Sequence, residues 1–276
     1  MDEIKYRRLT TIEEMHEATK LIQKVWGEEG TISPFLFIAQ SHIGGSLLGA
    51  FYQNNLVGVN YGFIGKEGLE IFLYSHLLAV DSDYRNYGIG GRLKNLQRET
   101  AKKDGLNKIV WTFDPLQSKN AFLNFHKLGA VSNQYKQNFY GHMGNELNTG
   151  TDSDRLLVEW LVSTEKRKVY SYTVVTCGIK EEETVPLVSS WSPINAPVVA
   201  IPVPDNIQFI KTMNSNIAKR WQVFLRESLT YYFQNGYAIV DFEMHKGRDI
   251  QYYILEKKGL YLGSEEAHDY KDKWRD

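Results

Sequence analysis

Segment 76–93 contains the residue types that bind an anion. It reads HLLAVDSDYRNYGIGGRL, with an arginine at 85 and glycines at 88, 90 and 91. Glycines at the start of a helix leave main-chain N–H groups accessible, and the positive end of the helix dipole lies at the same place. Arg85 adds a full positive charge. The segment therefore predicts a loop that binds a phosphate or diphosphate group.

Two common phosphate-binding motifs do not fit this loop. The dinucleotide fingerprint needs a third glycine where Leu93 stands, and it belongs in the first βα unit of a parallel sheet. A P-loop ends in Gly-Lys-Ser or Gly-Lys-Thr, and this chain contains neither triplet. What remains is Arg85-x-x-Gly88-x-Gly90. By itself this pattern leaves open whether the loop binds a ligand or is a tight connection.

The elements on either side of the loop follow from hydrophobic periodicity. The apolar run 77–80 predicts a strand before the loop. A helix after it is indicated by residues at helical spacing: Ile89, Leu93, Leu96 and Thr100. Strand 108–113 follows the stop at Asp104-Gly105, and we expect it to run parallel to the strand before the helix.

The rest of the chain predicts an α+β fold with a mixed sheet. Before the loop we expect a strand at 4–9, a helix from a capping box at Thr10 and Glu13 to Trp26, a short helix after Ser33-Pro34, and strands at 46–52, 56–64 and 69–80. After 108–113 we expect a helix from about Ser118 to Gly129 and strands near 139–140, at 156–162 and at 170–177. A loop-rich connection is expected at 186–204, with a strand at 198–203 near its end. A helix at 216–233 and strands at 237–242 and 250–255 complete the chain.

The glycine loop and the order of the first ten elements together resemble the GCN5-related N-acetyltransferase (GNAT) superfamily. The resemblance implies an acyl-CoA-binding core at 1–147 and a C-terminal α/β half at 148–276 that packs on the core and walls the acceptor pocket. It also implies which residues bind the cofactor: Leu78, Ala79, Val80, Arg85, Asn86, Tyr87, Gly88, Ile89, Gly90, Gly91, Asn120 and Phe125.

The resemblance also suggests catalytic residues. His76 lies in the strand before the loop, where members of the superfamily often carry a base, and imidazole has a suitable pKa. Asp114 follows the next strand and is the second candidate. The alternatives are a packed strand histidine and a turn aspartate. Phe125 stands where the family has a tyrosine acid, so Tyr140, His126 or solvent must protonate the thiolate.

Two further stretches, 111–121 and 154–160, resemble a bacterial subgroup associated with N-acylamino-acid racemases. Some of its members are N-succinyltransferases that act on D-amino acids. An amino acid or a succinyl group carries a carboxylate, which needs a cationic partner, and the candidates are Lys119 and Arg155. The alternative for each is a surface ion pair.

Composition excludes several classes of function. The net charge is −1 and the pI is about 6.7, so nucleic acid and anionic membranes are disfavoured as partners. Cys177 is the single cysteine, so it forms no internal disulfide, and no apolar run is long enough to span a bilayer. We therefore expect a cytoplasmic protein. The histidines lack paired spacing, so we expect no metal site.

The resemblance to the GNAT superfamily implies an acyl-CoA-dependent N-acyltransferase. It would transfer an acetyl or succinyl group from acetyl-CoA or succinyl-CoA to a small amine, including an amino acid, by direct attack of the amine on the thioester. Two alternatives stay open: a protein N-acetyltransferase, and a non-catalytic module that binds CoA. The acyl group, the chirality of the acceptor and the oligomeric state are also open, with a homodimer as one option.

Overall fold

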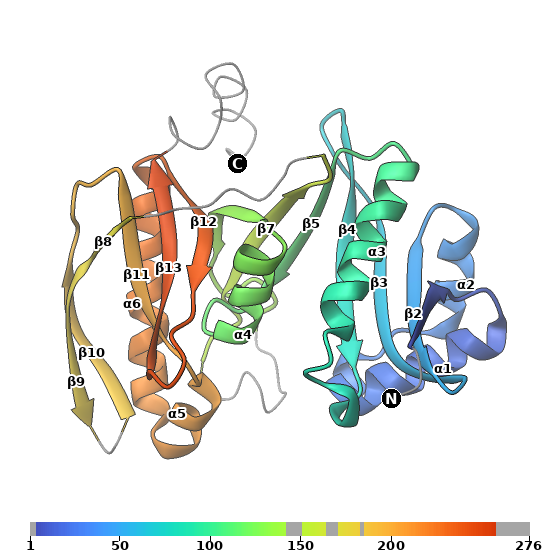
Figure 1. Ribbon diagram of the computed structural model, residues 1–276, viewed down its shortest axis with the longest axis horizontal. Helices are drawn as coiled ribbons and strands as arrows, with labels where there is room; N and C mark the ends of the chain where they lie inside the picture. The colour runs from blue at the N-terminus through green and yellow to red at the C-terminus, as the bar shows by residue number, and fades with distance from the viewer. Residues whose placement is uncertain (1–3, 142–150, 164–170, 183–184, 258–276) are drawn as a thin grey trace. The chain divides into compact units, whose positions relative to one another are not determined.

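The computed structural model describes residues 4–141, 151–163, 171–182 and 185–257 (Figure 1). The chain forms two compact units. The first contains residues 1–111 and 159–164, and the second contains 112–158 and 165–276. The predicted fold class, a mixed α/β fold, is confirmed. The predicted domain boundary after residue 147 and the predicted wall of an acceptor pocket stay predictions.

The first unit is a mixed sheet with helices packed on it. Its elements are β1 (Lys5–Arg8), α1 (Ile12–Trp26), α2 (Pro34–His42), β2 (Ser46–Tyr52), β3 (Asn55–Glu67), β4 (Glu70–Val80), α3 (Ile89–Lys103), most of β5 (Lys108–Phe113) and the last residues of β7 (Arg155–Leu161). The strand order is β1-β2-β3-β4-β5-β7. Strands β1 to β4 pair antiparallel. Strand β4 pairs parallel with β5, as the sequence predicts.

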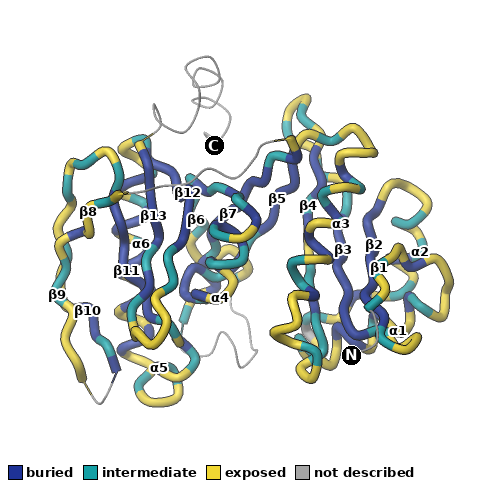
Figure 2. The backbone as a smooth tube through the Cα atoms, viewed as in Figure 1, coloured by how far each residue is buried: buried dark blue, intermediate teal, exposed yellow. Residues whose placement is uncertain are grey.

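Alternation along β2 separates two layers of hydrophobic core. Leu47 and Phe51 pack in a cluster with α1, whereas Leu48 and Ala50 pack in a cluster with Ile89 of α3. This period of two is what a strand covered on both faces requires. Figure 2 shows β2 and β3 as mostly buried. The sheet thereby holds β4 and the start of α3 in fixed positions.

The capping box of α1 lies one residue later than the sequence suggests. Thr11 Oγ1 accepts a hydrogen bond from the Glu14 N–H at 3.3 Å, and Glu14 Oε2 accepts from the Thr11 N–H at 3.3 Å. Glu14 Oε2 also accepts from the Thr10 N–H at 2.8 Å. Thr10 and Glu13 have the same spacing in the sequence, so spacing alone does not distinguish the two boxes.

The second unit contains further strands, most of them paired antiparallel, and a long helix. Its elements are α4 (Ser118–Ala121), a π-helical turn (Phe122–Lys127), β6 (Val131–Lys136), the start of β7, β8 (Thr173–Val174), β9 (Thr176–Glu182), β10 (Val185–Ser192), β11 (Val198–Pro204), α5 (Ile207–Met213), α6 (Ser215–Gln234), β12 (Tyr237–Glu243) and β13 (Ile250–Lys257). The strand order is β7-β6-β12-β13-β11-β8, and β9 pairs with β10 separately.

Two of the expected elements in this unit are wrong. Segment 137–140 is a turn rather than a strand, because the Asn138 N–H donates to the Asp154 carboxylate at 2.9 Å and Asn138 has a φ of 47°. The loop-rich connection expected at 186–204 is interrupted by β10, which the sequence does not predict, whereas the strand expected at 198–203 is confirmed as β11. Among the described residues, β8 pairs with β11 only at residues 199 and 200. The prolines at 202 and 204 lie beyond these pairs, where β11 has no hydrogen bonds to make with β8, so the missing N–H of proline is tolerated.

Asp154 is the centre of a buried polar network in the second unit. It is 1% exposed and accepts from the Tyr135 hydroxyl at 2.7 Å, from Arg226 Nε at 2.9 Å and from the Asn138 N–H. The carboxylate raises the pKa of the Arg226 guanidinium and adds to the effect of burial in raising the pKa of the Tyr135 hydroxyl.

We expect Asp154→Asn to lower the free energy of unfolding by about 3 kcal/mol, because it leaves the Arg226 cation without its buried partner. Urea denaturation measures this. Asp152→Asn is the matched control: Asp152 pairs with Arg226 Nη2 at 2.7 Å but is 46% exposed, so we expect a loss below about 1 kcal/mol. Equal losses for the two variants would contradict the prediction.

Among the described residues, we find no helix with the length and apolar character needed to cross a bilayer.

Candidate active site

The loop after β4 adopts a conformation that opens the N-terminus of α3. Asp81 caps a short turn (Ser82–Tyr84), and its Oδ1 accepts from the Asp83 N–H at 3.3 Å. Gly88 is the N-cap residue of α3 and has a φ of 77° and a ψ of 6°, a left-handed conformation that favours glycine. No side chain caps this helix, so its first N–H groups are left to another acceptor.

The N–H groups at this end of α3 point away from the helix's own carbonyls. The Arg92 N–H donates to the Gly88 carbonyl at 3.1 Å, and the N–H groups of residues 89–91 precede this first helical bond. A Cβ atom at Gly90 would meet only Leu78 Cδ2, at 3.4 Å, which is an ordinary van der Waals contact. The loop therefore has the free donors and the open surface that a diphosphate needs.

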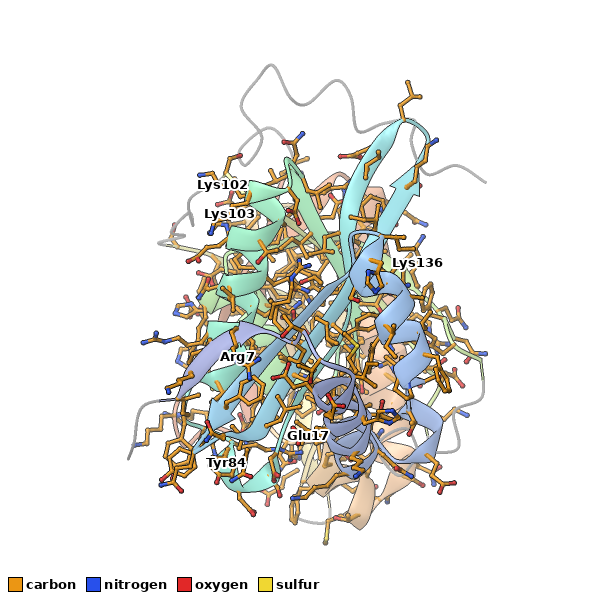
Figure 3. The ribbon with its side chains drawn as sticks, turned by 90° about the vertical axis from the view of Figure 1, so that its right-hand side faces the viewer. Arg7, Glu17, Tyr84, Lys102, Lys103 and Lys136 are labelled. Atoms are coloured by element: carbon orange, nitrogen blue, oxygen red, sulfur yellow. The ribbon has the colours of Figure 1, made fainter. Side chains whose placement is uncertain are left out.

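Charges around the loop favour an anion. Arg85 is exposed, and its Nε donates to the Val80 carbonyl at 3.4 Å, which keeps the guanidinium beside the loop. The nearby carboxylate of Asp81 is paired with Lys24 Nζ at 2.9 Å, and this pairing lowers the pKa of Asp81. Figure 3 shows Tyr84 at the opposite end of α3 from Lys102 and Lys103.

Strand β4 contains a bulge where its pairing with β5 ends. The register against β3 shifts between Tyr61 and Phe63, so that Ser75 and His76 together lie opposite Gly62. Among the described residues, β4 and β5 pair only at Leu73 with Ile109 and at Tyr74 with Val110. The predicted cofactor-contacting residues 78–80 lie beyond this point, where an extended ligand can hydrogen-bond to the strand.

His76 lies at this bulge among aromatic rings. Its ring centroid is 6.0 Å from that of Tyr61, 5.7 Å from that of Phe63 and 6.1 Å from that of Tyr74. Although part of the side chain is exposed, the surrounding rings desolvate the imidazole and lower its pKa below 6.5. His76 is therefore mostly neutral at pH 7 and can accept a proton.

A buried lysine lies on the other side of the bulge. Lys94 of α3 is 4% exposed, its Nζ donates to Ser75 Oγ at 2.8 Å, and it lies 3.8 Å from the centroid of the Trp111 ring. Burial lowers the pKa of Lys94 from 10.5 to about 7. Lys94 is not among the residues predicted from the sequence. Its spacing from Gln97 and Ala101, which are also buried on α3, is the only signal that could have identified it.

The shifted pKa of Lys94 predicts how stability depends on pH. The amine loses its proton near pH 7 in the folded protein but near 10.5 in the unfolded chain. Between these values the unfolded chain binds more protons, so stability rises with pH. Relative to Lys94→Met, we expect the wild type to gain about 2 kcal/mol from about pH 7 to about pH 9. Urea denaturation at several pH values measures this, and parallel curves for the two proteins would contradict it.

The remaining predicted catalytic residues lie in the second unit. Asp114 Oδ1 accepts from the Leu116 N–H at 2.9 Å, and its Oδ2 accepts from Gln117 Nε2 at 3.3 Å. These bonds form a turn before α4, as expected for a turn aspartate. A catalytic role for Asp114 stays a prediction. The Tyr140 hydroxyl is 3.2 Å from Thr112 Oγ1, and the residue is 43% exposed.

Lys211 of the second unit interacts electrostatically with Asp114 and with Arg155. Burial lowers the pKa of Lys211 on α5, Asp114 opposes the shift and Arg155 adds to it. The Arg155 guanidinium also lies 5.3 Å from the centroid of the Tyr140 ring. The Arg155 cation and the Asp114 carboxylate thus both lie close enough to the Lys211 amine to change its pKa. Lys211 was not predicted, because its partners lie far away in sequence.

The residues predicted on and after α4 differ in exposure. Lys119 and Asn120 are exposed. Phe125 is fully buried, with ring centroids 5.8 Å from Phe113 and 5.9 Å from Tyr253. In the same π-helical turn, His126 Nδ1 lies 3.0 Å from the Asp241 carboxylate.

None of the described residues forms a group of three or more histidine, cysteine, aspartate or glutamate side chains that could hold a metal ion.

The first part of the chain is similar to known acetyltransferases. Residues 11–130 match the model described as "Acetyltransferase (GNAT) family". The chain is similar to the ribosomal-protein-S18-alanine N-acetyltransferase from Escherichia coli, with 15% identity, a TM-score of 0.48 and coverage of 61% of this chain and 100% of that one. It is also similar to a GNAT family acetyltransferase from Elizabethkingia anophelis with acetyl-CoA bound, with 21% identity, a TM-score of 0.44 and coverage of 58% and 99%. No curated protein sequence matches.

Proposed function

We propose that this chain is an acyltransferase that transfers an acetyl or succinyl group from acyl-CoA to the amine of a small molecule that also carries a carboxylate. The match of residues 11–130 to the model described as "Acetyltransferase (GNAT) family" supports this proposal. The single observation that supports this most directly is the uncapped N-terminus of α3 next to Arg85, because such an end favours a diphosphate. A D-amino acid is one acceptor of this class, and the sequence resemblance to racemase-associated proteins favours it.

In the proposed reaction, the amine attacks the thioester carbonyl, the C–S bond breaks, and CoA leaves as a thiol. His76 accepts the proton that the amine loses, either directly or through a water molecule, because its pKa keeps it neutral at pH 7. A main-chain N–H near Leu78 donates to the carbonyl oxygen as negative charge develops there. Tyr140, His126 or solvent protonates the thiolate, since Phe125 has no acidic proton.

For the acceptor's carboxylate we propose Arg155 and Lys211 as the binding residues. Both are cations of the second unit, and a carboxylate that binds between them would relieve their mutual repulsion. Lys119 is exposed on α4 and remains the weaker candidate.

We expect Lys211→Met to raise the KM for an amino acid acceptor about 10-fold, because one charge-assisted hydrogen bond is lost. The KM for the corresponding decarboxylated amine should change less than about twofold. Steady-state kinetics with the two acceptors measure this. Lys219→Met, at an exposed position of α6, is the matched control. An equal change for both acceptors would show that Lys211 does not bind a carboxylate.

The assay for the whole proposal is thiol release from acetyl-CoA and succinyl-CoA, detected with a chromogenic disulfide. The acceptors are D- and L-amino acids, simple amines and short peptides. Release that depends on an amino acid and on one donor supports the proposal. Release only with peptides favours a protein N-acetyltransferase. Stabilisation by CoA in a thermal shift assay without any release favours a non-catalytic binding module. Localisation in the cytoplasm and a homodimeric assembly also remain part of the proposal.

A further inference from the structure

Four polar side chains are buried together between α3 and the sheet of the first unit. They are Asn60, Ser75, Lys94 and Gln97, which are between 0% and 4% exposed. Lys94 Nζ donates to Ser75 Oγ at 2.8 Å, and Asn60 Nδ2 lies 3.5 Å from the same oxygen. Asn60 Nδ2 also donates to the Leu77 carbonyl at 3.3 Å. The cluster thus connects α3 and β3 to two residues of β4.

The polar groups of this cluster are costly to bury. The contacts of Lys94 Nζ within the described residues are a hydroxyl and the Trp111 ring rather than a carboxylate. Asn60 Oδ1 and both polar atoms of the Gln97 side chain have no hydrogen-bond partner in the described residues. Burying such groups costs free energy, and apolar residues of similar volume would pack at lower cost. A role other than stability is the better explanation for polar residues at these positions.

The cluster holds the strand on both sides of His76. Ser75 precedes His76 and is held through its hydroxyl, and Leu77 follows it and is held through its carbonyl. This is the bulge in β4, where the parallel pairing with β5 has already ended at Tyr74. A bulge turns individual side chains in a new direction, and such distortions recur beside active sites. With β5 no longer paired, the contact to Ser75 fixes the main chain at His76 from α3.

We propose that Lys94 is a positioning residue that acts through Ser75 to fix the main chain at His76 and so the direction of the imidazole. This inference rests on the proposed role of His76 as the base. Lys94 itself contacts neither donor nor acceptor. Its removal lowers the rate of the chemical step and leaves cofactor binding at Arg85 to Gly91 unchanged.

The first experiment compares Lys94→Met with the wild type. We expect kcat to fall about 10-fold, since a small misplacement of a catalytic group costs this much or more. The dissociation constant of CoA, measured by calorimetry, and the KM for acyl-CoA should each change less than about threefold. Methionine fits the space and removes a buried amine, so the melting temperature should stay the same or rise. Lys102→Met, at an exposed position of the same helix (Figure 3), is the matched control and should behave as the wild type.

The second experiment tests whether Lys94 acts through His76. In a His76→Gln background, Lys94→Met should lower kcat by less than about twofold, because the group that it positions is already absent. A general weakening of the structure would instead lower kcat about 10-fold in both backgrounds, and that result would overturn the proposal. Unchanged kcat in Lys94→Met alone would overturn it as well. Ser75→Ala removes the same hydrogen bond from the other side and should reproduce the effect.

A third measurement does not depend on activity. Hydrogen–deuterium exchange of the peptide that covers β4 should be faster in Lys94→Met and in Ser75→Ala than in the wild type, without any substrate present. Equal exchange would overturn the proposal even if the enzyme assay gives no turnover. If His76→Gln alone keeps full activity, the proposed base is wrong. Faster exchange then still supports the contact of Lys94 with the strand.

Discussion

Replacing Gly90 with aspartate is expected to abolish acyl-CoA binding while the protein stays folded. The new carboxylate would lie at the N–H groups of residues 89–91 and repel the diphosphate that we place there. The fold tolerates the change, because the new Cβ makes only an ordinary contact with Leu78 Cδ2 at 3.4 Å. An aspartate in the first turn also interacts favourably with the helix dipole. We expect the dissociation constant of CoA to rise at least about 100-fold, or about 3 kcal/mol, in calorimetry.

Asn95→Asp is the matched control for this variant. It adds the same charge at an exposed position of α3, beyond the uncapped first turn, so CoA binding should change less than about threefold. Gly88 is less suitable for substitution, since its φ of 77° strains any other residue. A loss of CoA binding in such a variant could then come from a change in folding rather than from the lost site. Wild-type affinity in Gly90→Asp would mean that the cofactor does not bind at this loop.

Replacing His76 with glutamine is expected to lower kcat/KM about 100-fold or more, because the amine loses the group that accepts its proton. Glutamine has a similar size and keeps a polar tip among the rings of Tyr61, Phe63 and Tyr74. The dissociation constant of CoA should not change. In the wild type, kcat/KM should rise with pH through the pKa of His76, which lies below 6.5, and reach its plateau near neutral pH. The variant should lack this rise.

His16→Gln makes the same substitution at an exposed position of α1 and should leave both the rate and the pH profile unchanged. If His76→Gln keeps the wild-type rate, His76 is a packed strand histidine and the base is another group. Asp114 is then the next residue to test. A loss of rate without a change in the pH profile would indicate a structural role for the ring rather than proton transfer.

Local sequence signals determined the first part of the fold and the glycine loop. The spacing of Gly88 and Gly90, the apolar run before them and the helical period after them all concern neighbouring residues. Such signals act within one or two turns of chain and can be read without knowing the fold. For this reason the predicted range of β5, 108–113, agrees with the structure. The same reasoning does not choose between Thr10 and Thr11 as helix caps.

The tertiary structure decided which polar residues are buried and what they contact. Lys94 is one of several lysines on α3, and only the packing of that helix on β4 makes it a buried amine beside Ser75, with a pKa near 7. Segment 137–140 became a turn because Asn138 bonds to Asp154, and Lys211 lies within electrostatic range of Arg155 because α5 brings it there. Burial and charge interactions depend on residues far apart in sequence, so the glycine loop between strand and helix was predictable, whereas the environments of His76, Lys94 and Lys211 were not.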